Sequence, residues 1–355
     1  MEQGKKVFVG MSGGVDSSVA AWRLKEQGYD VVGVFIKVWH PDFLVCNWEE
    51  ERLDAMRVAA NLDIPFLTCD AEKDYRDEVA KYFISEYIAG RTPNPDVMCN
   101  KYVKFGAFLR FAKEHKADFI ATGHYARRID RTDGKASLYR GVDVNKDQSY
   151  FLWSLTNEQL NYTLLPIGDT NKEQIRQEAE RAGIPTATKK DSQGVCFLGH
   201  IDIPEFISHY VDLKEGDVLD TVGNVIGKHK GAMVYTLGQR HGFTLNTQDQ
   251  SREVYYVQSK NVVNNTVTVA VRRPVLQISQ DLILQNIVLR EEVKVGDTLS
   301  AQTRYRQTPF GVEVKFITDK GMVLKITEDS TEAVASGQSC VLYKDELCLG
   351  GGVVV

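Results

Sequence analysis

A glycine- and serine-rich stretch near the N-terminus has the composition of a phosphate-binding loop. It reads Gly10-Met11-Ser12-Gly13-Gly14-Val15-Asp16-Ser17 and follows a short apolar run. Glycines let successive backbone N–H groups converge on an anion, and the N-terminus of the following helix favours negative charge. No lysine stands where a G-x-x-x-x-G-K-[ST] loop has one, so the carboxylate of Asp16 is the group that could help to hold Mg²⁺. The alternative is a plain glycine turn in which Asp16 or Ser17 caps the helix.

A cysteine with an acidic neighbour is the second candidate for chemistry. Residues 92–100 read T-P-N-P-D-V-M-C-N, with Asp96 three positions before Cys99. The two prolines predict a stiff loop over 91–99, followed by a helix over 101–116. A helix N-terminus stabilises a thiolate, and Asp96 could move a proton to or from the reacting group. In the alternative interpretation, Cys99 is buried and inert and Asp96 caps the helix.

A second cysteine lies in residues 191–197, which read D-S-Q-G-V-C-F and contain Cys196. The glycine nearby predicts a mobile loop, and Lys189 and Lys190 give it an electropositive approach. Both features favour a reactive thiolate. A structural cysteine that packs beside Phe197 is the alternative.

The elements that must position these groups alternate between strand and helix over the first 200 residues. Apolar runs predict strands over 6–10, 31–36, 65–68 and 118–122, with helices over 17–27, 49–61, 74–89 and 101–116. This order is typical of an open parallel sheet covered on both faces. From about residue 216, short alternating runs separated by Gly, Asn and Asp predict an all-β half. The expected fold is α/β, a doubly wound parallel sheet over 1–200 followed by β-rich units over 201–272 and 273–355.

Composition excludes several classes of protein. The 355 residues are 43% hydrophobic and 26% charged, which excludes wholesale disorder, and no run of eighteen apolar residues predicts a membrane-spanning helix. A secretory leader is not expected, so a cytoplasmic location is the default. Six cysteines without a C-x-x-C pair predict neither a disulfide scaffold nor a zinc site, and we interpret Cys69, Cys340 and Cys348 as packing residues. The net charge of -5 argues against indiscriminate nucleic-acid binding.

Six motifs in one order resemble those of the tRNA-specific 2-thiouridylases of the bacterial MnmA type. They read S-G-G-V-D-S, T-P-N-P-D-V-M-C-N, A-T-G-H-Y, N-K-D-Q-S-Y-F-L, D-S-Q-G-V-C-F and C-L-G-G-G, and the resemblance runs from Val7 to the C-terminus. It implies a pyrophosphate-loop domain of the adenine nucleotide alpha hydrolase type, a central β domain and a C-terminal β-barrel. It also implies ATP-dependent adenylation of the wobble uridine C2 oxygen in tRNA, followed by sulfur transfer from a cysteine persulfide.

The same resemblance implies roles for individual residues. ATP and Mg²⁺ would be held by Gly10, Met11, Ser12, Gly13, Gly14, Val15, Asp16 and Ser17, with Asp16 on the metal and Ile36 and Gly123 beside the adenosine. Cys196 would carry the persulfide, and Cys99 would form a transient disulfide with it. Asp96 would act as the acid or base, and Asn94, Pro95 and Asp96 would face the target base.

Contacts with tRNA are also implied by the resemblance. The matching positions are His124, Lys146, Asp147, Gln148, Arg304, Tyr305 and Gln338. Arg304 and Arg306 flank Tyr305, an arrangement in which a ring can stack on a base beside two cations, although solvated surface charge is the alternative. The implied partners are the tRNAs for Lys, Glu and Gln and a cysteine desulfurase or sulfur-relay protein as the donor. No membrane partner is expected, and the chain is expected to be a monomer.

Two other functions compete with this expectation. Another ATP pyrophosphatase, activating a small carboxylate or carbonyl for amide transfer, would have no use for a Cys99/Cys196 pair. A non-enzymatic RNA-binding module would leave the phosphate loop without a purpose. Loss of turnover on removal of the cysteines, or absence of ATP turnover with tRNA, separates the three.

Overall fold

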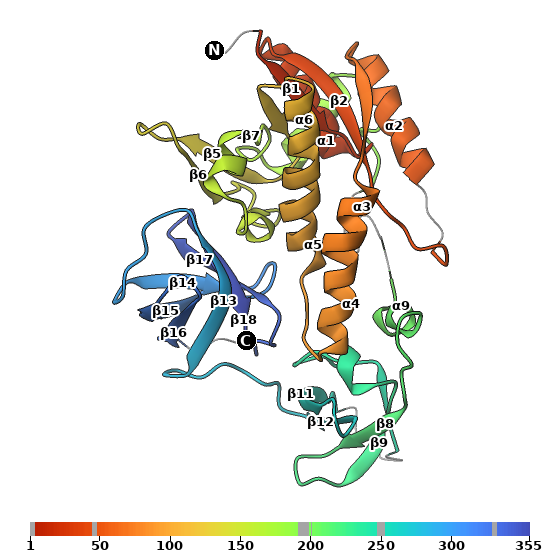
Figure 1. Cartoon of the computed structure of the whole chain (residues 1–355), viewed down its shortest axis with the longest axis vertical. Helices are drawn as coiled ribbons and strands as arrows, with labels where there is room; N and C mark the ends of the chain where they lie inside the picture. Colours follow the sequence, from red (N-terminus) through yellow and green to blue (C-terminus); the bar gives the residue numbers. More distant parts are fainter. Residues whose placement is uncertain (1–3, 45–47, 191–198, 200, 247–252, 329–331) are drawn as a thin grey trace.

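In the computed structural model the described residues, 4–44, 48–190, 199, 201–246, 253–328 and 332–355, form three sheets (Figure 1). The first has the strand order β3 (Phe66–Asp70), β2 (Asp30–Lys37), β1 (Lys6–Gly10), β4 (Phe119–Ala121) and β7 (Thr163–Leu164). Its strand pairs are parallel. Four of these strands lie where the apolar runs predict them, which confirms the parallel α/β sheet.

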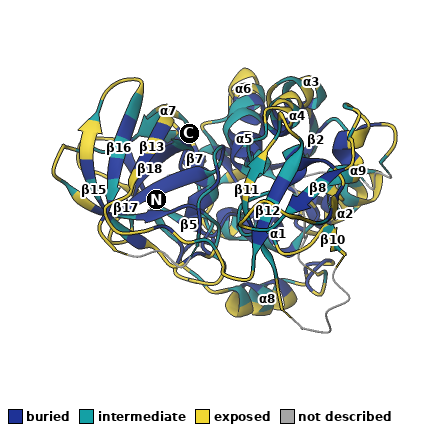
Figure 2. Ribbon diagram, turned by 90° about the horizontal axis from the view of Figure 1, so that it is seen from below, coloured by how far each residue is buried: buried dark blue, intermediate teal, exposed yellow. Residues whose placement is uncertain are grey.

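Helices cover both faces of this sheet. One face carries α1 (Val15–Glu26), α2 (Trp48–Asn61) and α8 (Lys172–Arg181). The other carries α3 (Glu72–Asp74), η1 (Tyr75–Ala80) and α4 (Lys81–Ile88), and a second helical run of α5 (Pro95–Met98), η2 (Cys99–Ala107) and α6 (Phe108–Glu114). Side chains alternate along β1, as the two-residue period of a strand requires. Val7 and Val9 pack into the core under α1, α2 and α8, and Phe8 packs into the core on the opposite face. Exposed residues lie along the outer sides of α6 and α8 (Figure 2).

The helix that carries Cys99 begins earlier than its sequence predicts. The loop ends at Asn94, whose side-chain Oδ1 accepts a hydrogen bond from the Val97 N–H at 3.2 Å, and Pro95 occupies the first helical turn. The prediction of a loop as far as Cys99 is therefore wrong, because proline is well accommodated at the first position of a helix. The run continues through the wider π-helical turns of η2, a geometry often found at functional sites.

The middle of the chain forms the second sheet. Its order is β10 (Phe243–Leu245), β9 (Val225–His229), β8 (Gly216–Leu219), β12 (Thr266–Ala270) and β11 (Tyr256–Asn261). Shorter helical elements are η3 (Ser149–Leu152), α7 (Asn157–Asn161), α9 (Ile203–Ser208) and η4 (Ala232–Val234). The core of the domain built on the second sheet includes Phe206 and Val218. It also includes Phe83 and Tyr87 of α4, so this domain packs against the end of that helix.

The C-terminal strands close into a barrel. Their order is β13 (Asp281–Leu289), β16 (Gly321–Ile326), β15 (Phe310–Ile317), β14 (Thr298–Gln302), β17 (Ser339–Lys344) and β18 (Leu347–Val354), and β18 pairs back onto β13. Together with the parallel sheet, this confirms the expected fold class. The antiparallel hairpin of β5 (Ala126–Asp130) and β6 (Ala136–Arg140) extends the barrel sheet through the Leu347–Tyr139 pair.

A buried arginine fixes the barrel to the N-terminal domain. The Arg290 guanidinium donates to the carbonyl oxygens of Trp153 at 2.5 Å, Leu155 at 2.9 Å and Cys348 at 2.9 Å. Hydrogen bonds to a charged group contribute more than neutral ones, so these bonds hold the two units together. Among the described residues, no helix is long and apolar enough to cross a membrane.

Candidate functional site

The phosphate loop lies at the carboxyl edge of the parallel sheet, where the strand order reverses. The chain moves from β1 to β2 and β3 on one side and returns to place β4 on the other side of β1. Ligands of open parallel sheets bind in the crevice at such a point. Gly10 ends β1 and Gly123 follows β4, so both glycines lie at this edge of the sheet.

The loop itself requires glycine. Gly13 has a φ of 71°, and a Cβ atom there would lie 2.7 Å from the Glu51 carbonyl oxygen. Gly14 is the N-cap residue of α1, so the alternative in which Asp16 or Ser17 caps this helix is wrong. Ser17 Oγ instead accepts from the Ser12 N–H at 3.3 Å. The first-turn N–H groups of a helix have no intrahelical partner, so they are available to an anion.

The residues expected beside a nucleotide gather around this loop. A Cβ atom on Gly123 would lie 2.6 Å from Ser17 N, so the end of β4 packs against the first turn of α1. Ile36 Cδ1 lies 3.6 Å from the position of a Cβ atom on Gly10. Met11 and Val15 are buried in the core, and only their backbone can take part in binding. The structure therefore brings the predicted set together, and its role in ATP binding stays a prediction.

Two residues that sequence reasoning missed contact Asp16. Lys172 Nζ and the Tyr125 hydroxyl group each donate to Asp16 Oδ1 at 2.7 Å. Gln148 positions Tyr125, because its Oε1 accepts from the Tyr125 N–H at 2.9 Å and its own N–H donates to the Tyr125 carbonyl at 2.8 Å. Tyr125 stands inside the motif A-T-G-H-Y, so its position was visible in the sequence. Lys172 is 156 positions from Asp16 and had no local signal.

The carboxylate of Asp16 can share a metal ion but cannot hold one alone. No group of three or more His, Cys, Asp or Glu side chains that could bind a metal occurs within the described ranges. Mg²⁺ is commonly bound by one or two carboxylates together with phosphate oxygens of a substrate. Asp16, half-buried beside a phosphate loop, fits that arrangement.

The segment that carries Cys196 begins beside the phosphate loop. Cys196 itself lies outside the described residues, so its persulfide and its disulfide with Cys99 stay predictions. Lys189, just before that segment, donates to Asp54 Oδ2 on α2 at 2.7 Å. Asp54 Cβ would lie 2.9 Å from a Cβ atom on Gly13. The anchor of the segment is thus next to the glycine turn.

Cys99 lies beyond the same edge of the sheet. Its helix precedes β4 and ends near the amino edge, so the start of the helix lies at the carboxyl edge. The Phe105 ring lies 5.7 Å from the ring of His124, which follows β4, and Cys99 precedes Phe105 in the same helical run. Cys99 is fully buried, so a reaction at its sulfur requires its neighbours to move.

Asp96, three positions earlier, shares its side of the helix. The N-cap of this helix is Asn94. The alternative interpretation, in which Asp96 caps the helix beside an inert Cys99, is therefore wrong about the cap.

The remaining cysteines of the described ranges are structural. Cys69, Cys340 and Cys348 are buried, which confirms their interpretation as packing residues. Burial raises the pKa of the thiols of Cys69 and Cys340 to about 12. Neither forms a thiolate near neutral pH.

The residues expected to contact tRNA fall into two groups. Gln338 belongs to a barrel loop that contacts the chain just before Asn94, since the Thr92 N–H donates to the Ser336 carbonyl at 2.8 Å. The Tyr305 ring lies 4.7 Å from the Phe151 ring, and the Arg306 guanidinium lies 5.1 Å from the centre of the Tyr305 ring. These residues and Lys146 are accessible at least in part.

Besides Gln148, which positions Tyr125, Asp147 and Arg304 of this set also form hydrogen bonds within the protein. Asp147 is buried, accepts from the Gly141 and Ser149 N–H groups and pairs with Arg140 at 3.0 Å. Arg304 donates through Nη2 to the Leu237 carbonyl at 2.9 Å and so connects the barrel to the central domain. Their contact with tRNA stays a prediction.

His124 is buried and neutral. It is 7% exposed, and a hydrogen bond of 2.8 Å joins its Nδ1 to Thr122 Oγ1. Burial, followed by the charge of Lys104, lowers the pKa of His124 well below its usual value of 6.5. A contact with RNA therefore uses the neutral imidazole rather than an ion pair.

The buried His124 predicts a loss of stability in acid. Below pH 6.5 the unfolded chain binds a proton at this histidine and the folded chain does not, so the free energy of unfolding falls as the pH is lowered. The slope from one such group reaches about 1.4 kcal/mol per pH unit. We expect His124→Gln to remove this part of the slope between pH 7 and pH 5 in urea unfolding, whereas His241→Gln, at an exposed position, leaves it. Equal slopes in all three proteins would contradict the assignment.

Comparison with known proteins gives a match along most of the chain. Residues 5–200 match a family model described as the tRNA methyl transferase HUP domain. Residues 204–271 match the tRNA methyl transferase PRC-barrel domain, and residues 279–354 match the aminomethyltransferase beta-barrel domain.

Curated relatives cover the chain almost completely. A protein of Escherichia coli O1:K1 / APEC described as tRNA-specific 2-thiouridylase MnmA is 46% identical over 99% of this chain and 97% of its own length. The protein of that name from Proteus mirabilis (strain HI4320) is 45% identical with the same coverage. Among solved structures, a U34-tRNA thiolase from Methanococcus maripaludis matches with a TM-score of 0.36 and 17% identity, over 59% of this chain and 66% of that one. That degree of similarity is too low to support an inference.

Proposed function

Because this chain belongs to the MnmA family of tRNA-specific 2-thiouridylases, we propose that it adenylates the C2 oxygen of the wobble uridine with ATP and then replaces that oxygen with sulfur from a cysteine persulfide. The products are 2-thiouridine, AMP and pyrophosphate. One observation carries the proposal beyond family membership. The phosphate loop and the helix turn of Asp96 and Cys99 lie at the same edge of one sheet.

The phosphate loop would hold ATP. The N–H groups of the first turn of α1 and the hydroxyl groups of Ser12 and Ser17 face the crevice edge, and Lys172 adds a positive charge next to Asp16. Mg²⁺ held by Asp16 and the phosphates would neutralise charge on the departing pyrophosphate. Adenylation turns the C2 oxygen, which is a poor leaving group, into part of AMP.

Sulfur transfer requires two thiols. The outer sulfur of a persulfide on Cys196 attacks C2, and the C2–O bond breaks as AMP leaves. The Cys99 thiolate then attacks the inner sulfur, the S–S bond breaks, and the transferred sulfur stays on C2. The resulting Cys99–Cys196 disulfide must be reduced by an external dithiol, which is itself oxidised to a disulfide, before the next turnover. Asp96 supplies or accepts the proton at this end of the helix.

The partners follow from the same proposal. The RNA substrates are the tRNAs for Lys, Glu and Gln, and a cysteine desulfurase or sulfur-relay protein loads Cys196 with sulfur. The protein acts as a monomer. Gln338 and Tyr305 contact the tRNA beside the target base, which faces Asn94–Asp96.

The direct test is product formation. Purified protein is incubated with unmodified tRNA transcript, Mg·ATP, a cysteine desulfurase with free cysteine as the source of persulfide sulfur, and a dithiol that reduces the disulfide, and the RNA is digested and searched for 2-thiouridine by mass spectrometry. We expect 2-thiouridine only when ATP is present. Release of AMP and pyrophosphate without 2-thiouridine would instead favour an ATP pyrophosphatase with a small-molecule acceptor.

Lys172 is expected to contribute to ATP use. Its ammonium group, mostly buried, lies 2.7 Å from Asp16 Oδ1 and adjoins the loop that would bind the phosphates. Loss of one charge-assisted contact corresponds to a reduction of roughly 10- to 100-fold in kcat/KM for ATP. We expect this for Lys172→Gln in a pyrophosphate-release assay, and no change for Lys135→Gln on the exposed β5–β6 hairpin. Equal kinetics for the two variants would remove Lys172 from the ATP site.

A further inference from the structure

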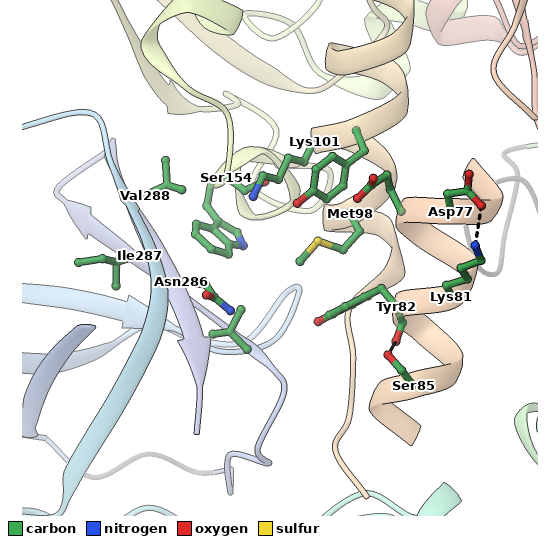
Figure 3. A pocket seen from close by; sticks show the side chains of 14 residues that line it. Asp77, Lys81, Tyr82, Ser85, Met98, Lys101, Ser154, Asn286, Ile287 and Val288 are labelled. Carbon is green, nitrogen blue, oxygen red and sulfur yellow. Dashed lines mark hydrogen bonds and ion pairs between the residues drawn. The ribbon is translucent and has the colours of Figure 1, made fainter. Parts of the chain in front are cut away.

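A second cleft lies outside the phosphate loop, between the helices of the N-terminal domain and the barrel. It has a volume of about 650 Å³, within the range of small-ligand sites. Figure 3 shows Tyr82, Met98 and Lys101 entering it from the helical side and Asn286 facing them from β13. Met98 immediately precedes Cys99, so this cleft adjoins the catalytic helix turn. Nothing in the proposed reaction uses it.

Two buried polar groups at this cleft lack partners. Trp153 is 2% exposed and Ser154 is 1% exposed, and both line the cleft. Among the described residues, no group forms a hydrogen bond with Trp153 Nε1 or Ser154 Oγ. Leaving such a group unsatisfied costs about 1–3 kcal/mol. An indole N–H can only donate, so the missing partner of Trp153 is a hydrogen-bond acceptor.

The facing strand is distorted where it meets the cleft. The pairing of β13 with β18 shifts register between Gln285 and Val288, and Asn286 has a φ of 52°. A β-bulge of this kind redirects a side chain, and asparagine tolerates the left-handed conformation. The Asn286 amide therefore enters the cleft, where it offers a donor and an acceptor side by side.

The charges around the cleft nearly cancel. Asp77 forms an ion pair with Lys81 at 2.8 Å. Glu78 and Lys101 are the other acidic and basic side chains among the described residues that line the cleft. A balanced lining of this kind gives no basis for selecting a polyphosphate. Tyr82 and Tyr102 supply aromatic surfaces, and Lys101 lies 4.9 Å from the Tyr102 ring. The lining thus suits a planar, uncharged ring with donors and acceptors on its edge.

We propose that this cleft binds one unstacked nucleobase, contributed by a nucleotide of the RNA substrate other than the target uridine. The base stacks on Tyr102, its edge meets the Asn286 amide, and it accepts a hydrogen bond from Trp153. The RNA source follows from continuity, because the N–H of Met98, which lines the cleft, donates to the carbonyl oxygen of Asn94 at 3.4 Å, in the segment expected to face the target base. The assignment rests on the proposed function, since it takes RNA as the substrate.

The test combines abasic RNA with cleft variants. Each loop nucleotide around the target uridine is replaced singly by an abasic unit in a full-length tRNA, and dissociation constants are measured by fluorescence anisotropy at one fixed salt concentration. One position should weaken binding to the wild-type protein by roughly tenfold, the range of a base stacked on an aromatic ring. Tyr102→Ala should lose the same factor with intact RNA and lose nothing further with that abasic RNA.

Matched variants separate binding from packing. Tyr102→Phe keeps the ring and should bind intact RNA as the wild type does. Trp153→Phe keeps an aromatic ring but removes the indole N–H donor together with the second ring, and it should weaken binding of intact RNA severalfold. Gln285→Ala, at an exposed position on the same strand but outside the cleft, should leave it unchanged. The proposal is overturned if, at every abasic position, the dissociation constant of Tyr102→Ala rises by the same factor as that of the wild type, because the two changes would then act independently.

Two further measurements show whether the bound base comes from RNA and whether a negative result rejects the cleft assignment alone or the proposed function as well. Saturable binding of free UMP or AMP that is lost in Tyr102→Ala, without coupling to any RNA position, would overturn the assignment to RNA. Formation of 2-thiouridine is measured with the same wild-type protein. If that product forms and the coupling is absent, only the cleft assignment fails. If neither product nor RNA binding is seen, the proposed function fails with it.

Discussion

Replacing Cys99 with alanine is expected to reduce 2-thiouridine formation by roughly 10³-fold or more, because loss of a reacting nucleophile cannot be compensated by binding. The adenylation step uses no thiol, so pyrophosphate should still be released once per enzyme molecule, without turnover. Affinity for tRNA should not change, since Cys99 is fully buried and presents no surface to RNA. Quenched-flow measurement of pyrophosphate and mass spectrometry of the digested RNA record the two steps separately.

Cys69 provides the matched control. It is also buried in the N-terminal domain, and burial raises the pKa of its thiol to about 12, so it is not a thiolate at neutral pH. Cys69→Ala removes the same atom from the same domain and should lower stability without abolishing thiolation. Thiolation by Cys99→Ala at the wild-type rate would show that Cys99 is a packing residue too.

Replacing Asp16 with asparagine is expected to stop the reaction earlier, at adenylation. Asparagine keeps the size of the side chain and an acceptor for the Tyr125 hydroxyl group, but it removes the charge that Lys172 and a metal ion require. Loss of a preorganised electrostatic contact of this kind reduces rates by roughly 10²- to 10³-fold. We therefore expect pyrophosphate release to fall by that factor with tRNA present, while sulfur loading onto Cys196 continues.

Two variants distinguish chemistry from folding in this prediction. Asp16→Asn leaves the mostly buried Lys172 without its ion pair, which lowers stability, so the double variant with Lys172→Gln should recover stability and stay inactive. Asp169→Asn breaks an exposed ion pair with Arg23 and should alter neither property. Pyrophosphate release by Asp16→Asn at the wild-type rate would place the metal and the phosphates elsewhere.

Local sequence chemistry predicted a glycine-rich turn between the first strand and the first helix, and the phosphate-binding role of that turn stays a prediction. The positive φ of Gly13 and the glycine N-cap of α1 follow from residues that are adjacent in the chain, and such short-range geometry depends on residue type. The strand periods of the parallel sheet were equally local. The helix start was misplaced, because the two prolines suggested a loop while Pro95 and the Asn94 cap in fact begin a helix.

Contacts between distant segments were beyond sequence reasoning. The ion pair between Asp16 and Lys172 depends on how α8 packs against α1. The β5–β6 hairpin joins a barrel whose other strands begin about 140 positions later, through the pairing of Tyr139 with Leu347 and the hydrogen bond from the Arg140 N–H to the Glu346 carbonyl. The same holds for the cleft, which takes residues from two domains.

The sequence by itself therefore determined four strands of the parallel sheet, the glycine-rich turn after the first of them, the β-rich second half, the two candidate cysteines and the family. These features rest on short stretches of chain, where residue type limits backbone conformation and chemistry directly. Only the tertiary structure decided that Lys172 and Tyr125 contact Asp16, that Cys99 is buried beyond the sheet edge, and that a bulge at Asn286 faces Trp153 across a cleft. Those outcomes depend on packing between segments far apart in the chain, which residue order alone does not specify.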